Sequence, residues 1–324
     1  MSTDQDQDQD QDQFSGPDGA PIRLRSVPSD LPPHPLTLDF TPLPGHPQWP
    51  LRTLPPAAWD TGGWQFEEKL WDPTLYALQL LQDFVTTAWV TGATGVPPNR
   101  PDWTQIIPFP PPTPVASPFT FLGWYANQPN HVQFIEHDLE ELRNLMENDR
   151  QRYMAEIVAQ ADSATLYFLS MLGITRSSRP NSFRLIQAAL RIGEYVGMYF
   201  KNEFLRVRPS VLAPGLQPPF GPPGHPSFPN NHCLQSFLVA HCLEAVTPKD
   251  ATTGNSIYQY QLNWLAERIA VNRERAGLHY PSDTAGGRFL ACRLFDDYLS
   301  QWPQPGGTAS RFTRLLTAAS GEWP

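Results

Sequence analysis

The chain has 324 residues, 37 of them proline, with 40% apolar residues and a net charge of −9. This length allows one large domain or two ordinary ones, and the proline excess argues against a regular β-sandwich, because each proline removes a backbone donor. No basic stripe and no apolar run of membrane-spanning length is visible, which excludes nucleic-acid binding and a transmembrane helix. With only three cysteines, the sequence predicts a cytoplasmic protein.

The first sixty residues differ in composition from the rest of the chain. Residues 1–20 are dominated by alternating Asp and Gln, which predicts a disordered tail because such a segment cannot bury apolar area. Residues 21–60 combine proline with Leu, Phe and Trp, which predicts an extended arm. An arm of this kind can wrap a neighbouring subunit, so we expect a homo-oligomer. Residues 61–324 are expected to form a single helical catalytic domain.

Helical periodicity dominates that domain. It begins near Trp64, with Asp72-Pro73 as a break or a helix start. The longest predicted helix covers 132–173 and ends at Gly173. Further helices are predicted at 181–205, 232–246, 255–276, 283–301 and 308–320. Since alternating β-type runs are scarce, the fold class expected is an all-α helical bundle with long proline-rich loops, for example at 97–118.

The first segment that can carry chemistry is KNEFLRVRP. Lys201 and Arg208 lie seven residues apart, which would place both cations on one face of a helix. Pro209 is expected to end that helix and to leave Arg208 in its last turn. Taken alone, a cationic helix end is an ordinary solvated feature, because the helix dipole favours it.

The second segment is GHPSFPNNHCLQSF. A proline-rich loop leads to Asn230 or Asn231 as the predicted N-cap, which places His232 in the first turn of the helix. The backbone N–H groups there attract oxyanions and disfavour a positive imidazole. The alternative is an ordinary capped helix with an incidental histidine.

The third segment is RIAVNRERAGLHYPSD. Gly277 is expected to end one helix, and Ser282 to cap the next, with Asp283 in its first turn. His279 then lies in the connection, where Asp283 can accept a hydrogen bond from it and fix its tautomer. The alternative is an ordinary loop histidine.

Together these segments supply the parts of an oxyanion site. Three cations, Lys201, Arg208 and Arg273, can neutralise the oxygens of an anion. One histidine can bond to the central atom while the other exchanges protons with an oxygen. The combination therefore predicts a pocket for a tetrahedral or trigonal oxyanion.

The three blocks resemble the tripartite signature K-x6-R-P, P-S-G-H and S-R-x5-H-x3-D of the superfamily that joins type 2 phosphatidic acid phosphatases and vanadium-dependent haloperoxidases. The resemblance covers residues 180–300. It implies a helical bundle in which His279 coordinates vanadate or becomes a phosphohistidine, His232 is the acid–base histidine and Asp283 supports His279. It also implies that vanadate, or phosphate in the same site, is held by Lys201, Arg208, Asn230, Asn231, Arg273 and His279.

The sequence departs from that signature at two places. Asn230-Asn231 stands where the family has Ser-Gly, and Asn272 stands where a serine precedes the second arginine. An Asn amide can still donate to an oxyanion, but Asn231 cannot copy the close backbone approach of glycine. We therefore expect weaker vanadate binding than a Ser-Gly loop would give.

His225 favours one of the two activities that the resemblance implies. It lies seven residues before His232, and this spacing resembles that of bromoperoxidases. The resemblance then implies a peroxidase that uses hydrogen peroxide to oxidise bromide or iodide, with Lys201 assisting, and that halogenates small organic acceptors. A soluble acid phosphatase acting through a phosphohistidine is the first alternative, and a degenerate oxyanion-binding protein is the second.

Overall fold

The computed structural model describes residues 71–87, 89, 102–106, 131–302 and 309–324. The predicted tail and arm lie outside these residues, as does most of the predicted 97–118 connection. The described residues form helices and no β-strand, apart from one isolated bridge between Lys249 and Ser256. The predicted all-α class is therefore confirmed, whereas the haloperoxidase type of bundle stays a prediction.

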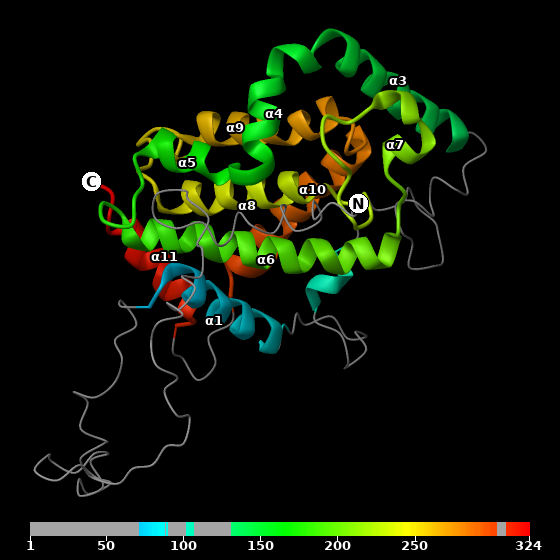
Figure 1. Cartoon of the computed structure of the whole chain (residues 1–324). Helices are drawn as coiled ribbons and strands as arrows, with labels where there is room; N and C mark the ends of the chain where they lie inside the picture. Colours follow the sequence, from blue (N-terminus) through cyan, green and yellow to red (C-terminus); the bar gives the residue numbers. More distant parts are fainter. Residues whose placement is uncertain (1–70, 88, 90–101, 107–130, 303–308) are drawn as a thin grey trace, which may run out of the picture.

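Two helices run side by side through the centre of the bundle (Figure 1): α6 (Pro180–Phe204) and α8 (Asn231–Val246). On one side, α1 (Pro73–Thr86) and α11 (Arg311–Ser320) pack against α6. On the other side, α9 (Gln259–Arg275) packs along α8. The large hydrophobic cluster that these helices share holds the ends of α6 and α8 in place, and the candidate site lies at those ends.

Glycines let the central helices approach closely where α8 begins. A Cβ atom at Gly193 would lie 3.1 Å from Cγ of Gln235, and one at Gly197 would lie 2.0 Å from Oδ1 of Asn231. Gly197 therefore provides the space in α6 that the Asn231 side chain occupies. The side chain of Asn231, which stands where the resembled signature has glycine, is accommodated by the neighbouring helix.

Helix α10 (Pro281–Leu294) packs on the start of α8 through two further glycines. A Cβ atom at Gly286 would lie 2.5 Å from the ring of Phe228, and one at Gly287 would lie 2.6 Å from the carbonyl oxygen of Asn230. The loop that precedes α8 is thus held directly against α10.

The prediction of one continuous helix at 132–173 is wrong. The segment forms α3 (His131–Asn148), α4 (Arg150–Ser163) and α5 (Thr165–Leu172), with Asp149 and Ala164 between them. The predicted end at Gly173 is confirmed, since it takes a left-handed conformation with φ 60°. In Figure 1 the chain arches over the bundle from α3 to α5.

A tertiary contact accounts for the first of these breaks. Arg150 is buried, and its side chain donates to the backbone oxygens of Arg275 and Leu216. These bonds tie the first turn of α4 to the end of α9 and to the turn at Pro214–Leu216. Helical periodicity carries no information about such an anchor.

The other predicted helices are found with shifted ends. They correspond to α6, α8, α9, α10 with a π-helical continuation at Phe295–Leu299, and α11. Short turns at Pro209–Leu212 (α7), Pro214–Leu216 and Asp102–Gln105 complete the described chain. Within the described ranges no helix is long and apolar enough to span a membrane.

Candidate functional site

Lys201 lies in the last turn of α6 and is only 1% exposed. Its ammonium group donates to the carbonyl oxygens of Pro226 (2.8 Å), Ser227 (3.1 Å) and Pro229 (2.6 Å). These bonds draw the proline-rich loop onto the end of α6. Burial, together with the charge of Arg208, holds the pKa of Lys201 well below its usual value.

The prediction that Lys201 and Arg208 share a helix face is wrong. Helix α6 ends at Phe204, because Leu205 takes a left-handed conformation with φ 50°. Arg208 is extended and precedes α7. The two cations nevertheless come together, since the chain turns back at Leu205 and the charge of Arg208 acts on Lys201.

The guanidinium of Arg208 is 5% exposed and contacts two histidines. Nη1 lies 3.0 Å from Nε2 of His279 and donates to the carbonyl of Leu278 (2.9 Å). Nη2 lies 3.0 Å from Nδ1 of His225, and Nε donates to the carbonyl oxygen of His225 (3.1 Å). Because a guanidinium only donates, Nε2 of His279 carries a lone pair. Burial lowers the pKa of Arg208 to about 10.

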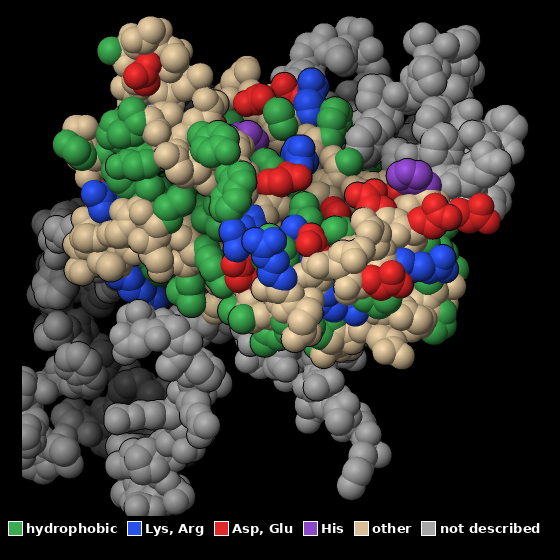
Figure 2. Space-filling model, turned by 90° about the horizontal axis from the view of Figure 1, so that it is seen from above, with side chains coloured by type: hydrophobic (Ala, Val, Ile, Leu, Met, Phe, Trp, Pro, Cys, Tyr) green, Lys and Arg blue, Asp and Glu red, His purple; other side chains and the backbone are tan. Residues whose placement is uncertain are grey.

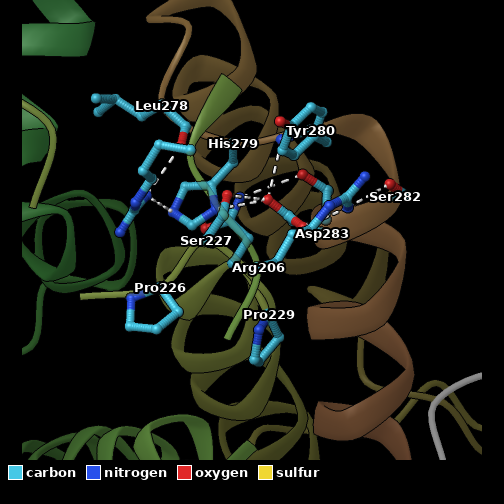
Figure 3. Close-up of polar contacts among 12 residues, drawn as sticks. Arg206, Pro226, Ser227, Pro229, Leu278, His279, Tyr280, Ser282 and Asp283 are labelled. Carbon is cyan, nitrogen blue, oxygen red and sulfur yellow. Dashed lines mark hydrogen bonds and ion pairs between the residues drawn. The ribbon is translucent and has the colours of Figure 1, made fainter. Parts of the chain in front are cut away.

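His279 and Asp283 meet as predicted. His279 is buried, and Nδ1 of its ring lies 3.2 Å from Oδ2 of Asp283 (Figure 3). Since Nε2 accepts from Arg208, Nδ1 bears the proton that Asp283 accepts. Burial and the nearby Arg208 charge hold the pKa of His279 well below its usual value, so the ring is neutral. This tautomer leaves Nε2 available to a metal or to a phosphorus atom.

Asp283 has three further partners that the sequence analysis missed. Its carboxylate accepts hydrogen bonds from Arg206 Nη1 (2.7 Å), Ser227 Oγ (2.5 Å) and the backbone N–H of Tyr280 (3.0 Å). Burial alone would raise the pKa of Asp283, but the Arg206 charge and these bonds hold it far below its usual value. Arg206 stands in the same KNEFLRVRP segment as Lys201. The presence of this third cation in the segment was the sequence signal that could have identified Arg206 as a site residue.

The predicted cap of α10 is wrong. The helix begins at Pro281, and its N-cap is Tyr280 rather than the predicted Ser282. The Asp283 carboxylate accepts a hydrogen bond from the backbone N–H of Tyr280. Proline suits the first helical position because it lacks the N–H that would go unbonded there. Ser282 instead donates to Asp138 of α3 (2.5 Å).

His232 occupies the first turn of α8, as predicted, behind Asn230 as the N-cap. Its Nε2 lies 3.2 Å from the backbone oxygen of Gln160 in α4. A carbonyl only accepts, so Nε2 carries the proton and Nδ1 the lone pair. Burial, reinforced by the charge of Arg273, lowers the pKa of His232 to about 3.

The asparagines of the altered motifs have their side chains engaged in the fold. Oδ1 of Asn230 accepts from the N–H of Cys233 (3.2 Å). Oδ1 of Asn231 is buried against Gly197 and has no hydrogen-bond partner among the described residues. Asn272 is buried, and its side chain bonds to α4 and to Arg275. The start of α8 can offer an anion the backbone N–H groups of Asn231 and His232, since the N–H of Cys233 donates to Asn230.

The two remaining predicted residues also reach this region. Arg273 is 1% exposed, donates to the carbonyl of Ile157 (2.6 Å) and lies 5.8 Å from the ring of Phe220. His225 is half-buried beside Arg208, and burial together with the Lys201 charge lowers its pKa to about 4. The structure therefore brings every predicted site residue to the same ends of α6, α8, α9 and α10.

A buried carboxyl beside the site gives a prediction about stability. Glu274 is 5% exposed, and burial raises its pKa to about 8. The unfolded chain ionises it near the usual value of 4.5, so the native state loses stability as the pH rises toward 8. We expect Glu274→Gln to remove this loss, so that the wild type loses about 2 kcal/mol of unfolding free energy relative to the variant between about pH 6.5 and pH 8.5. Urea unfolding of the variant and of the wild type near pH 6.5 and pH 8.5 measures this difference in unfolding free energy.

The exposed Glu147, whose charge does not contribute to the raised pKa of Glu274, supplies the control for that measurement. Glu147→Gln should leave the pH dependence of the wild type unchanged. A Glu274→Gln curve that parallels the wild type over this range would contradict the buried-acid interpretation.

No protein-family model matches the chain, and no curated protein matches it. Within the described residues there is also no group of three or more His, Cys, Asp or Glu side chains that could hold a metal ion.

Proposed function

We propose that the ends of α6, α8, α9 and α10 form a vanadate site and that the protein is a vanadium-dependent haloperoxidase. The observation that carries the proposal is the environment of Lys201 and Arg208. Both are buried, and the hydrogen bonds described above join them to neutral carbonyl and imidazole acceptors. Among the described residues, the buried carboxylate of Asp283 acts on both cations, but it is also paired with Arg206. Buried cations whose charge is only partly compensated are costly, and an anion would complete the compensation.

The residues present fit an oxyanion bound through its central atom. Nε2 of His279 has a lone pair, and its tautomer is held by Asp283. Arg208 supplies a donor beside it, and Lys201, whose three N–H groups donate to carbonyl oxygens, supplies charge. Arg273 supplies a third cation, whose charge acts on His232. Arg208 now lies on Nε2 of His279, so its guanidinium would shift onto the oxygens of the anion as the anion takes that position.

When bound, vanadate would supply a Lewis acid of constant oxidation state that activates hydrogen peroxide. Lys201 and Arg208 would neutralise the charge on the bound oxygens and orient them. One peroxide, one bromide or iodide and one proton yield one hypohalous acid and one water. The halide loses the two electrons that reduce the O–O bond, and the hypohalous acid then halogenates an organic acceptor.

The protonation state of His232 favours this reaction over phosphate ester hydrolysis. Its proton lies on Nε2 toward Gln160, so Nδ1 is a base that can take a proton from peroxide. A phosphatase needs a His232 that is protonated on Nδ1 at its first step, because the leaving oxygen must receive a proton from it. The resemblance to bromoperoxidases at His225 supports the same choice.

A phosphatase remains the second candidate, and the His279–Asp283 pair is the observation that favours it. Nε2 of His279 could attack phosphorus, the P–O bond to the leaving alcohol would break, and water would later release phosphate from the histidine. This route requires His232 to be protonated before the first step. A cytoplasmic location and a homo-oligomeric state stay predictions from the sequence alone.

One assay tests these functions together. The purified apoprotein is reconstituted with orthovanadate and given peroxide, bromide and a phenolic dye, while parallel samples without vanadate receive p-nitrophenyl phosphate. We expect vanadate-dependent bromination, with a loss of at least about 1000-fold in His279→Ala, because no other described group would replace its lone pair.

Each alternative function would give a different result in these assays. Phosphate ester cleavage that vanadate inhibits, without bromination, would establish the phosphatase instead. Activity in neither assay, with vanadate still bound, would indicate an oxyanion-binding protein. His241→Ala is the matched control, because His241 lies on α8 beside Glu244 and Phe295 and should leave bromination unchanged.

A further inference from the structure

Helix α4 brings into the site a residue from outside the three matched segments. Gln160 is fully buried, with 0% exposure. Its backbone oxygen accepts from Nε2 of His232 (3.2 Å). One turn earlier, the backbone oxygen of Ile157 accepts from Nη2 of Arg273 (2.6 Å). Gln160 therefore lies beside an imidazole and a guanidinium of the proposed anion site.

The hydrogen bonds around Gln160 fix which way its amide group faces. Oδ1 of Asn272 accepts from Nη1 of Arg275 (2.8 Å), and a guanidinium only donates. The other end of that amide, Nδ2, donates to Oε1 of Gln160 (2.8 Å) and to Oε2 of Glu156 (3.2 Å). The oxygen of Gln160 is thereby held toward Asn272, and its nitrogen Nε2 faces away from Asn272 as a donor.

That nitrogen has no acceptor among the described residues and is shielded from solvent. A buried N–H donor without an acceptor is rare in folded proteins and calls for a partner. The positive charges of Arg273 and Lys201 both act on His232, the neighbour of Gln160. Two cations in this region favour a negatively charged acceptor over a neutral one.

The face of the molecule above this network carries further support for the position of α4. Basic and acidic side chains lie next to each other near the middle of that face (Figure 2). Between α4 and α9, Arg268 pairs with Glu156, and Arg275 pairs with Asp149 at 3.3 Å. These pairs join α9 to the start and middle of α4, so the turn that carries Gln160 is held over the site.

We propose that Nε2 of Gln160 donates a hydrogen bond to the oxyanion that His279, Lys201 and Arg208 bind. The inference rests on the proposed anion site and adds a neutral donor from α4 to the cations of α6 and of the following loop. The ligand class is a tetrahedral or trigonal oxyanion, such as vanadate or phosphate. Gln160 would thus be a binding residue, and its backbone oxygen would separately hold the tautomer of His232.

Equilibrium titration of the full chain with orthovanadate, and separately with inorganic phosphate, tests the proposal without any turnover. Gln160→Met keeps the length of the side chain and the backbone oxygen that holds His232, but it removes the donor. We expect both anions to bind about 10- to 100-fold more weakly, as for the loss of one hydrogen bond to a charged group. The exposed Gln151 on the same helix supplies the control Gln151→Met, which should bind as the wild type does.

A second variant separates donation from packing. Gln160→Glu keeps an oxygen for Asn272 and has nearly the same shape, but it replaces the donor by a negatively charged acceptor. We expect it to bind both anions at least about 100-fold more weakly. Thermal unfolding without anion, compared with that of the wild type, shows that the variant is folded. If Gln160→Met does not fold, this variant decides alone.

The outcomes keep the two proposals apart. A wild-type protein that binds neither vanadate nor phosphate would overturn the proposed function, and with it the role of Gln160. A wild-type protein that binds, together with Gln160 variants whose affinities are within about twofold of it, would overturn only the role of Gln160. In that case a water molecule, rather than the anion, would be the partner of Nε2.

Discussion

Replacing Asp283 by alanine should destabilise the protein by about 3 to 5 kcal/mol, because it breaks a buried ion pair and leaves one charge behind. Asp283 is 0% exposed and Arg206, 2.7 Å away, keeps only 8% of its side chain in contact with solvent. The substitution also removes the acceptor of His279 Nδ1 and Ser227 Oγ. For a chain of this size the melting temperature should fall by roughly 10 °C, which calorimetry measures.

The nearby Asp138 is the matched control for that experiment. It contacts the same guanidinium at 3.4 Å but its side chain is 17% exposed. Asp138→Ala should therefore cost about 1 kcal/mol. In a double-mutant cycle, Arg206→Met and Asp283→Asn should show a coupling above about 1 kcal/mol. Additive effects would mean that the pair contributes nothing beyond its separate parts.

Replacing Gly287 by alanine should separate α10 from α8. The new Cβ atom would lie 2.6 Å from the backbone oxygen of Asn230 and 3.2 Å from the backbone nitrogen of Leu234. Neither atom belongs to a flexible side chain, so the helices must move apart. We expect a loss of about 3 kcal/mol of unfolding free energy, as for other overpacked cores. Because the start of α8 shifts, vanadate binding should weaken in the same variant.

Chemical denaturation and vanadate titration measure the two effects on one preparation. Gly221→Ala is the control, since nothing lies within 4 Å of its added Cβ atom, and it should change stability by less than about 0.5 kcal/mol. If Gly287→Ala had the stability of the wild type, the close approach of α10 to the Asn230 loop would not exist in solution.

Local chemistry accounts for the parts of the site that were predictable. Asn230 caps α8, Gly277 follows the end of α9 with φ 77°, and His279 meets Asp283. Each of these features depends on residues within a few positions of one another, where capping and steric rules apply directly. For the same reason the helical class and the approximate helix positions follow from composition and periodicity.

The prediction about Lys201 and Arg208 shows the limit of such rules. Their spacing of seven residues fits one helical face, yet the helix ends at Phe204. A leucine in the left-handed conformation has no sequence signal, and the loop is held by backbone oxygens that bind Lys201. The two cations converge through tertiary contacts rather than helical periodicity.

Taken by itself, the sequence determined the all-α class, the caps that place His232 and His279, and the set of cations that would suit an oxyanion. The tertiary structure decided which groups surround those residues. Arg206 neutralises Asp283, Arg208 lies on His279, and Gln160 arrives from α4, more than seventy positions before His232. The physical reason is that a backbone oxygen and a buried amide can serve anywhere in a chain, so only the packing of helices selects the ones that act.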